Sequence, residues 1–421
     1  MLEFMDYVQT AFCQASNWNH DNSYRTLTAT AHGKNYLRTP QLSTYSHGTA
    51  LLDFHTPSGL RLHISSLSAP NFATSYTVGS KGVLDGSLSF LYSSLGLQVP
   101  SKSSDINLHH LIRGYRQLQD LRKPDELWWS ETWHGGRRVD NRGMRIETIR
   151  PPDALLYGRL YLPASELEAL YIRRLSPTRL LTLSAVSNSN LPNGGTILGL
   201  LQNDCGKYTT ECLYSTDSAL LGVRGLYNFG LDPRKPPSVQ ETLSPTKGYG
   251  RFSLGGELYF SPLNKSGGLS TGLRFTTLPS HPGFPYTMTV TLNPLVGNLS
   301  STYAVKAGRN LALCTRFDFN FYSYESDVQI GMELWRMRKP DAESEWARKM
   351  LRPDWALAER IVRGDESVNG VLKARVDQNW KIGVLWESRI KELLVGIGAG
   401  FDLKRRDRVL DGVGIEVSYS S

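Results

Sequence analysis

The final stretch of the sequence, Val409 to Ser421, constrains the fold most, because it has the pattern of a strand that ends at the last residues of the chain. Successive side chains of a strand point to opposite faces. Apolar residues fall on one face and small or polar ones on the other, with Val413, Ile415, Val417 and Tyr419 opposite Gly414, Glu416 and Ser418. A closed barrel removes the exposed edge of such a strand by pairing it with the first strand. The alternative is a half-buried terminal strand of a soluble sheet.

The same alternation recurs in about twenty segments, most of them ~8–12 residues long, the length that a tilted strand needs to cross a bilayer. Tyr286 to Leu292 shows it most purely, because apolar residues there alternate with Thr287, Thr289 and Thr291. A soluble sandwich needs strands of about five or six residues. The sequence therefore predicts an all-β fold, a single large transmembrane β-barrel whose residues face lipid and lumen in turn. Two stacked soluble β domains remain the alternative.

The bulk composition sets limits on the function. Hydrophobic residues make up 40% of the 421 residues, and no run approaches the roughly 18 apolar residues of a membrane helix. The net charge of +8 comes from basic residues scattered among acidic ones, so nucleic-acid binding is not indicated, whereas anionic lipid or metabolites fit a lumen or rim. The four cysteines and nine histidines show no metal-site spacing, and we predict no metal and no cofactor.

The N-terminus predicts a short amphipathic helix over Met1 to Ser16, because apolar residues recur there at helical spacing: Leu2, Met5, Val8, Ala11, Phe12 and Ala15. This helix could lie in the lumen or on the membrane surface. We expect residues 1–24 to form a segment associated with the lumen and residues 25–421 to form the barrel. Met1 to Ser16 has neither a secretory signal nor an Arg-rich transit peptide, so a barrel would belong to a mitochondrial or plastid outer membrane.

Three stretches break the alternation, at about residues 120–152, 232–248 and 336–367, and these are predicted to be long loops. The first is charged and contains Trp128, Trp129 and Trp133. Tryptophan is common at the centres of interfaces, so these loops are either docking surfaces or disordered insertions.

One motif is typical of an enzyme. Gly268 to Gly272 matches the G-x-S-x-G pattern of a nucleophile elbow, which needs a strand, a sharp turn and a helix. Alternation runs straight through the motif, so we expect a strand there and no catalytic role for Ser270. We therefore predict that the protein is not an enzyme.

Several segments are similar to one known family. The opening LEFMDYVQTAFCQASNWNHDNSY (Leu2 to Tyr24), GSLSFLYS (Gly86 to Ser93), LYGRLYL (Leu156 to Leu162) and FDFNFYS (Phe317 to Ser323) resemble the fungal mitochondrial distribution and morphology protein 10 family. The resemblance spans the whole chain. It implies a nineteen-stranded, porin-like barrel of the mitochondrial outer membrane, related in architecture to the voltage-dependent anion channel.

The resemblance also implies partners. The family anchors the endoplasmic-reticulum–mitochondria encounter structure, whose other subunits carry lipid-transfer domains, and it joins the sorting and assembly machinery that inserts outer-membrane barrels; membrane phospholipids surround it. By motif match, Phe90 and Tyr92 contact the sorting machinery, and Phe317 and Phe319 contact the lipid-transfer partner. A bare membrane anchor is the alternative for these aromatic residues.

The family's last strand carries an insertion signal of the form polar-x-Gly-x-x-hydrophobic-x-hydrophobic. Two registers are open. Aligned on Gly412, Ile415 and Val417 fit, whereas aligned on Gly414, Val417 and Tyr419 fit.

An anion- or metabolite-conducting channel is the competing function, since a barrel of this size has a wide lumen. Arginines on the polar face would then line the pore: Arg61, Arg159, Arg224, Arg251 and Arg274.

Overall fold

The computed structural model describes residues 4–16, 18, 22–27, 51–80, 84–97, 99–112, 114–115, 118, 138–139, 145–146, 153–176, 178–189, 194–230, 250–279, 281–337, 368–404 and 409–421. No helix within these residues is long and apolar enough to span a membrane.

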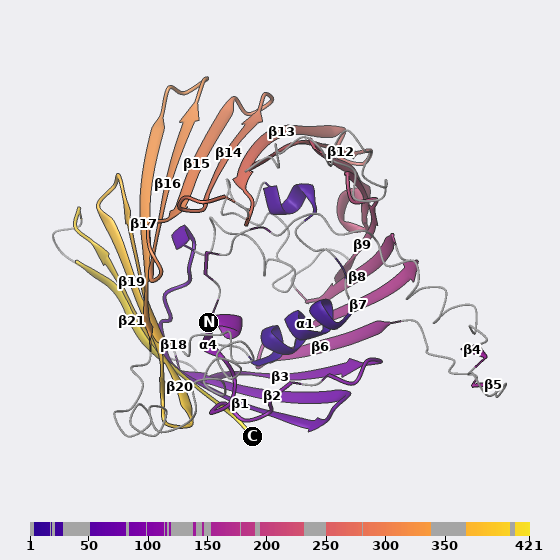
Figure 1. Cartoon of the computed structure of the whole chain (residues 1–421), viewed down its shortest axis with the longest axis vertical. Coiled ribbons are helices and arrows are strands. Elements are labelled where there is room, and N and C mark those ends of the chain that lie inside the picture. Colours follow the sequence, from indigo (N-terminus) through magenta and orange to yellow (C-terminus); the bar gives the residue numbers. More distant parts are fainter. Residues whose placement is uncertain are drawn as a thin grey trace.

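Nineteen strands form one sheet that curls into a ring (Figure 1). They are β1 (Gly59–Ala69), β2 (Phe72–Ser80), β3 (Leu84–Ser93), β6 (Ala154–Leu162), β7 (Glu166–Ser176), β8 (Arg179–Ser187), β9 (Gly195–Asp204), β10 (Tyr208–Ser215), β11 (Leu220–Asn228), β12 (Gly250–Ser261), β13 (Ser266–Thr277), β14 (Tyr286–Asn293), β15 (Asn298–Lys306), β16 (Leu311–Asn320), β17 (Ser326–Met337), β18 (Val368–Asp377), β19 (Lys381–Ile390), β20 (Leu393–Asp402) and β21 (Leu410–Ser420). The remaining elements are α1 (Phe4–Ala15), α4 (Leu108–Leu111), the 3-10 turn η2 (Asp217–Ala219), and the short pair β4 (Arg138–Val139) and β5 (Arg145–Ile146).

The ring closes where the first strand meets the last. Neighbouring strands elsewhere run antiparallel, but β1 and β21 run parallel, with Leu60 opposite Ile415 and Leu62 opposite Val417. An odd number of alternating strands leaves the first and last pointing the same way, so the closing pair has to be parallel. The predicted pairing of first and last strands, and with it the all-β barrel, is confirmed.

The alternation predicted for the strands is also confirmed. On β14, Met288 and Val290 are 47% and 41% exposed on the outer face, while Thr289 and Thr291 are 1% and 0% exposed inside. On β21, Ile415 and Tyr419 face outward, and Glu416 is buried in the lumen. The outer face of the barrel is therefore an apolar belt, and the polar residues point into the lumen.

The antiparallel order places the long connections on one end of the barrel. The links from β3 to β6, from β11 to β12 and from β17 to β18 all leave strands that point to the same end, which we call the long-loop rim. The C-terminal end of β21 lies at this rim as well. The opposite end, the short-turn rim, carries the links β12–β13, β14–β15 and β16–β17 among others.

Most of the predicted long loops lie outside the described residues. Residues 232–248 do so entirely, and within 120–152 only the pair β4–β5 is described. The third loop begins later than predicted, because Arg336 and Met337 still belong to β17 and pair with β18 across a bulge.

Because the resemblance implies a barrel in the mitochondrial outer membrane, we expect a protease site inserted into residues 232–248 and one inserted into residues 340–365 to be cut from the same side of that membrane. Both connections belong to the long-loop rim. A site placed in the β12–β13 turn at Pro262–Lys265, on the short-turn rim, serves as the matched control and should be cut only from the other side. Cleavage of intact and of osmotically opened mitochondria measures the sidedness; opposite sidedness of the two long connections would contradict the strand order.

Candidate docking surfaces and a filled lumen

Helix α1 lies inside the ring (Figure 1). Phe4, Met5, Val8 and Phe12 are buried, and they share one apolar cluster with residues of the stretch that contains α4. The wall contributes inward-facing apolar residues near the long-loop rim: Ala73, Leu91, Leu155, Leu170, Ile172, Leu180, Val371 and Leu394. Burial of apolar area stabilises such contacts by about 25 cal/mol per Å². The long-loop end of the lumen is thus packed like a protein core.

The alternation of apolar and polar residues does not predict this inner core. Near the long-loop rim the strands carry apolar residues on the inner face as well as on the outer face. In β7 the run Leu170-Tyr171-Ile172 and in β20 the run Leu393-Leu394-Val395 break the polar-inside rule. Continuous apolar runs of this kind are the sequence signal of a strand covered on both sides.

A polar strap follows α1 along the inner wall. Asn22 Nδ2 donates to Asp204 Oδ1 at 2.7 Å, and Asn228 donates to Asn22 Oδ1 at 2.6 Å. Ser23 Oγ donates to Glu211 at 2.5 Å. These bonds tie residues 22–23 to β9, β10 and β11, so the N-terminal segment is fixed by hydrogen bonds as well as by apolar packing.

The strap continues to β13. Tyr24 is fully buried, and its hydroxyl lies 3.1 Å from Ser270 Oγ. Burial raises the pKa of Tyr24 to about 12, so the phenol stays protonated and neutral in the lumen. Gly268 to Gly272 belong to one uninterrupted strand with Ser270 opposite Glu257, so the elbow that a G-x-S-x-G nucleophile needs is not formed.

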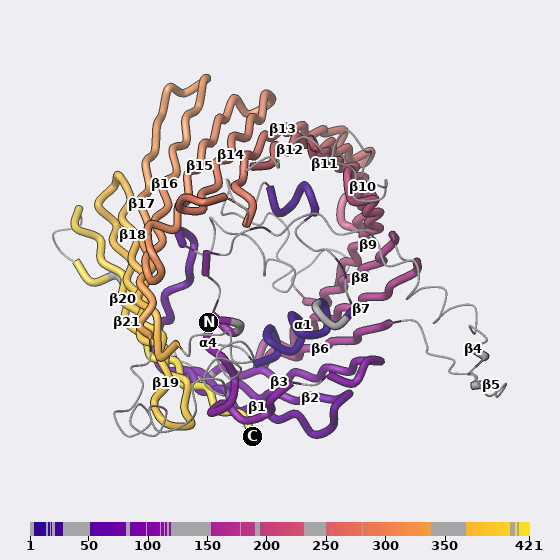
Figure 2. Tube along the Cα trace, viewed as in Figure 1, coloured from indigo at the N-terminus to yellow at the C-terminus, as the bar shows by residue number. Residues whose placement is uncertain are grey.

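A second inner segment, residues 51–58, leads into β1 along the opposite inner wall (Figures 1 and 2). Asp53 pairs with Arg316 of β16 at 3.1 Å, and Arg375 of β18 donates to the carbonyl of Leu52 at 2.9 Å. Pro57 packs against Gly398 and Gly414, where any added Cβ would collide with it. The alternation of strand residues does not predict this segment, because residues 51–58 lie before the first strand.

Two lumenal arginines, Arg224 and Arg316, each lie close to two acids. Arg224 lies 3.4 Å from Glu211 and 3.3 Å from Glu257, and Arg316 lies 3.3 Å from Asp318 as well as near Asp53. Of the five arginines expected to line a pore, Arg251 and Arg274 are also buried in the lumen, Arg159 bonds to Ser87, and Arg61 lies near Asp85. A paired guanidinium attracts a passing anion weakly. The described part of the lumen therefore contains α1 and residues 51–58, and the charges of Arg224 and Arg316 are paired there.

The residues proposed for the insertion signal lie on β21, which pairs with β1 at the seam where the barrel closes. Ile415, Val417 and Tyr419 face outward, and Gly412 and Gly414 share the inward-facing side of β21. The lumenal side of the seam is joined by His63 of β1, whose Nε2 lies 2.5 Å from Glu416 Oε1 and whose Nδ1 lies 2.8 Å from Thr77 Oγ1. The seam is thus held by a backbone ladder and a buried side-chain link.

The two aromatic pairs proposed as partner contacts both project outward. Phe90 and Tyr92 are 42% and 48% exposed near the long-loop rim, and Phe90 stacks on Phe72. Phe317 is 43% exposed near the short-turn rim and stacks on Phe319 with centroids 6.4 Å apart. The structure therefore does not bring the pairs together. They lie near opposite rims and on well-separated strands, β3 and β16.

Comparisons with known proteins identify the family of this chain. The family model described as Mitochondrial distribution and morphology protein 10 matches residues 1–359 and 348–421. Curated relatives of that name cover 100% of both chains: one from Phaeosphaeria nodorum is 62% identical, one from Sclerotinia sclerotiorum 57%, and one from Neurospora crassa 40%. Because the match extends over the whole length, the resemblance seen in the sequence is confirmed, and the chain belongs to the mitochondrial distribution and morphology protein 10 family.

Proposed function

We propose that this protein is a β-barrel of the mitochondrial outer membrane that serves as an anchor and assembly platform. Family membership supports a role in mitochondrial distribution and morphology. The apolar belt supports the membrane placement, since an outer face of this kind matches hydrocarbon rather than water. The proposed partners are the lipid-transfer-domain subunits of the endoplasmic-reticulum–mitochondria encounter structure and subunits of the sorting and assembly machinery.

The observation that carries this proposal is the contrast between the two faces of the wall. The lumen is occupied by α1 and residues 51–58 with paired charges, whereas the outer wall presents aromatic pairs that are free to contact other molecules. A conducting channel needs an open lumen. The occupied lumen supports an anchor over an anion or metabolite channel, and the exposed aromatic pairs support partner contacts on the outer wall and rims.

We expect Phe317→Ala combined with Phe319→Ala to lose the lipid-transfer partner while the barrel still inserts. Truncation of an aromatic hot spot at an interface costs about 2 kcal/mol or more, so the double variant should bind the partner at least about thirtyfold more weakly. Quantitative co-purification from detergent-solubilised mitochondria measures it, and extraction at high pH reports insertion.

The matched control is Leu258→Ala with Phe260→Ala, an outward i, i+2 pair near the same rim on β12. It removes comparable apolar area at a different place on the wall and should leave the partner bound. Equal loss in both double variants would mean that general apolar area, and not the Phe317–Phe319 pair, retains the partner.

A further inference from the structure

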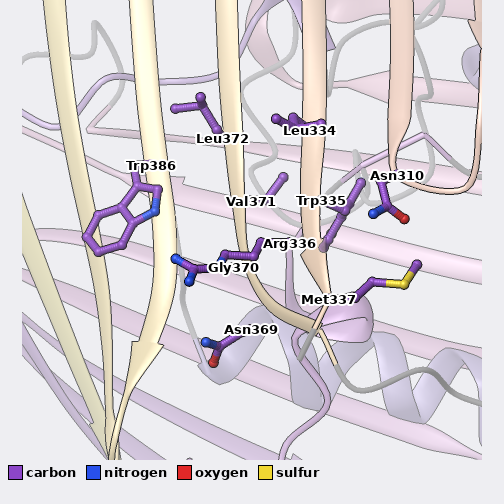
Figure 3. Close-up of a pocket in the computed structure, with 10 residues that line it drawn as sticks. All are labelled: Asn310, Leu334, Trp335, Arg336, Met337, Asn369, Gly370, Val371, Leu372 and Trp386. Carbon is purple, nitrogen blue, oxygen red and sulfur yellow. The ribbon is translucent and has the colours of Figure 1, made fainter. Parts of the chain in front are cut away.

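A groove lies on the outer wall where β17, β18 and β19 approach the long-loop rim (Figure 3). It encloses about 840 Å³. Leu334 and Arg336 open onto it from the outer face of β17, since Glu333 and Trp335, which flank Leu334 in sequence, face the lumen. Trp335 and Val371, whose side chains face the lumen, also contribute to the lining, but the side chains of Leu334, Arg336, Leu372 and Trp386 line the groove from the outer face.

The groove exists because one position has no side chain. Gly370 of β18 lies opposite Arg336 of β17 on one side and opposite Ser388 of β19 on the other. Because Gly370 has no side chain, nothing projects from β18 between these two neighbours. A Cβ there would lie 2.9 Å from the Glu387 carbonyl oxygen, so the position does not accept a larger residue easily. A bulge between Arg336 and Met337 widens the strand ends at the same point.

The wall of the groove has two chemically different parts. Leu334, Leu372 and Trp386 stand in register across the three strands and form an apolar floor. Arg336 follows two residues nearer the rim, about 6–7 Å along the strand. Figure 3 shows its guanidinium turned toward the side that carries Trp386. Arg336 is exposed and forms no side-chain hydrogen bond or ion pair with another described residue.

We propose that this groove binds an anionic glycerophospholipid, with the phosphate on Arg336 and an acyl chain along Leu334, Leu372 and Trp386. Arginine binds phosphate through two parallel N–H donors, and tryptophan is favoured at the level where chains meet head groups. A cation beside an apolar surface favours a ligand in which an anionic group is joined to a hydrocarbon chain. The inference rests on the proposed membrane placement and adds a defined lipid site to it.

Photocrosslinking tests the site in the full-length protein. With p-benzoylphenylalanine in place of Leu372, the protein is inserted into phosphatidylcholine vesicles that contain trace labelled phosphatidic acid or trace labelled phosphatidylcholine. One basic residue near a membrane surface contributes about 1 kcal/mol, so we expect phosphatidic acid to crosslink about fivefold more than phosphatidylcholine. Arg336→Gln should reduce that ratio to near one.

Residues on β7 provide the control, because Tyr171 and Arg173 also project outward near the long-loop rim and neither lines this groove. The same probe at Tyr171 measures the preference that one outward arginine gives without this groove, and the ratio of phosphatidic acid to phosphatidylcholine at position 372 should exceed the ratio at position 171. Equal crosslinking of the two lipids at position 372, or a ratio that survives Arg336→Gln, would overturn the lipid site. Absence of any lipid crosslink at position 171 would instead refute the membrane placement, so the two failures are distinguishable. In mitochondria, a crosslink at position 372 to a protein in place of lipid would assign the groove to a protein partner and overturn the proposal.

Discussion

Val290→Arg should lower the free energy of unfolding by about 2–4 kcal/mol, and Val417→Arg should have a similar effect. Both side chains face outward and away from the strand ends, Val290 in the middle of β14 and Val417 in the second half of β21. A guanidinium there must be desolvated into hydrocarbon or must pull water and head groups toward it. Urea titration of the barrel in lipid vesicles measures the loss.

Leu295→Arg is the control for this first prediction. Leu295 is 58% exposed and lies in the turn that directly follows β14, on the short-turn rim. The cost of an arginine falls to about 0–1 kcal/mol near the membrane surface. A barrel that tolerated arginine at positions 290 and 417 as well as at 295 would not have hydrocarbon against its outer wall.

Gly414→Ala should destabilise the seam, whereas Gly412→Ala should not. A Cβ at Gly414 would lie 2.5 Å from the carbonyl carbon and oxygen of Pro57, and these backbone atoms cannot turn aside as a side chain could. Overpacking of this kind typically costs about 1–3 kcal/mol. At Gly412 no atom lies within 4 Å of the added carbon, and alanine in place of a strand glycine stabilises by about 0.5–1 kcal/mol.

The same two variants decide the register of the insertion signal. Unfolding in vesicles reports only the packing of the finished barrel, while import into isolated mitochondria reports recognition of the last strand as well. If the signal is centred on Gly412, Gly412→Ala should insert poorly in mitochondria although its folded barrel is as stable as the parent. If Gly412→Ala is normal in both assays, the signal is centred on Gly414. Full stability of Gly414→Ala would contradict the contact with Pro57.

The wall of the barrel could be predicted from sequence because the two-residue alternation of a strand determines which side chains face outward and which face the lumen. In β14 and β21 each apolar residue faces outward, as alternation requires, and the closing of β1 on β21 follows from the need to pair a terminal edge. The resemblance to a known family supplied the strand number and the candidate aromatic pairs, which no periodicity contains. The roles of Phe90, Tyr92, Phe317 and Phe319 stay proposals.

The contents of the lumen could not be predicted, because they depend on contacts between residues far apart in sequence. The pairs Asp53–Arg316 and Asn22–Asp204 join the N-terminal segment to strands more than 180 residues away. The sequence predicts only that Glu211 and Arg224 face the lumen from neighbouring strands. Their ion pair depends on the register between β10 and β11, which places them opposite each other. The long loops lie largely outside the described residues.

The segment before β1 acts as a chord across an arc of the ring. Between Asp53, held by Arg316 on β16, and Pro57, seated on Gly398 and Gly414, the chain spans the inner faces of β16 to β21. A change in the shape of the barrel that alters the curvature between β16 and β21 would strain either the Asp53–Arg316 ion pair or the packing of Pro57 on Gly398 and Gly414. The sector from β16 to β21 should consequently move as a single stiff panel, and changes in barrel shape should be confined to the remaining wall.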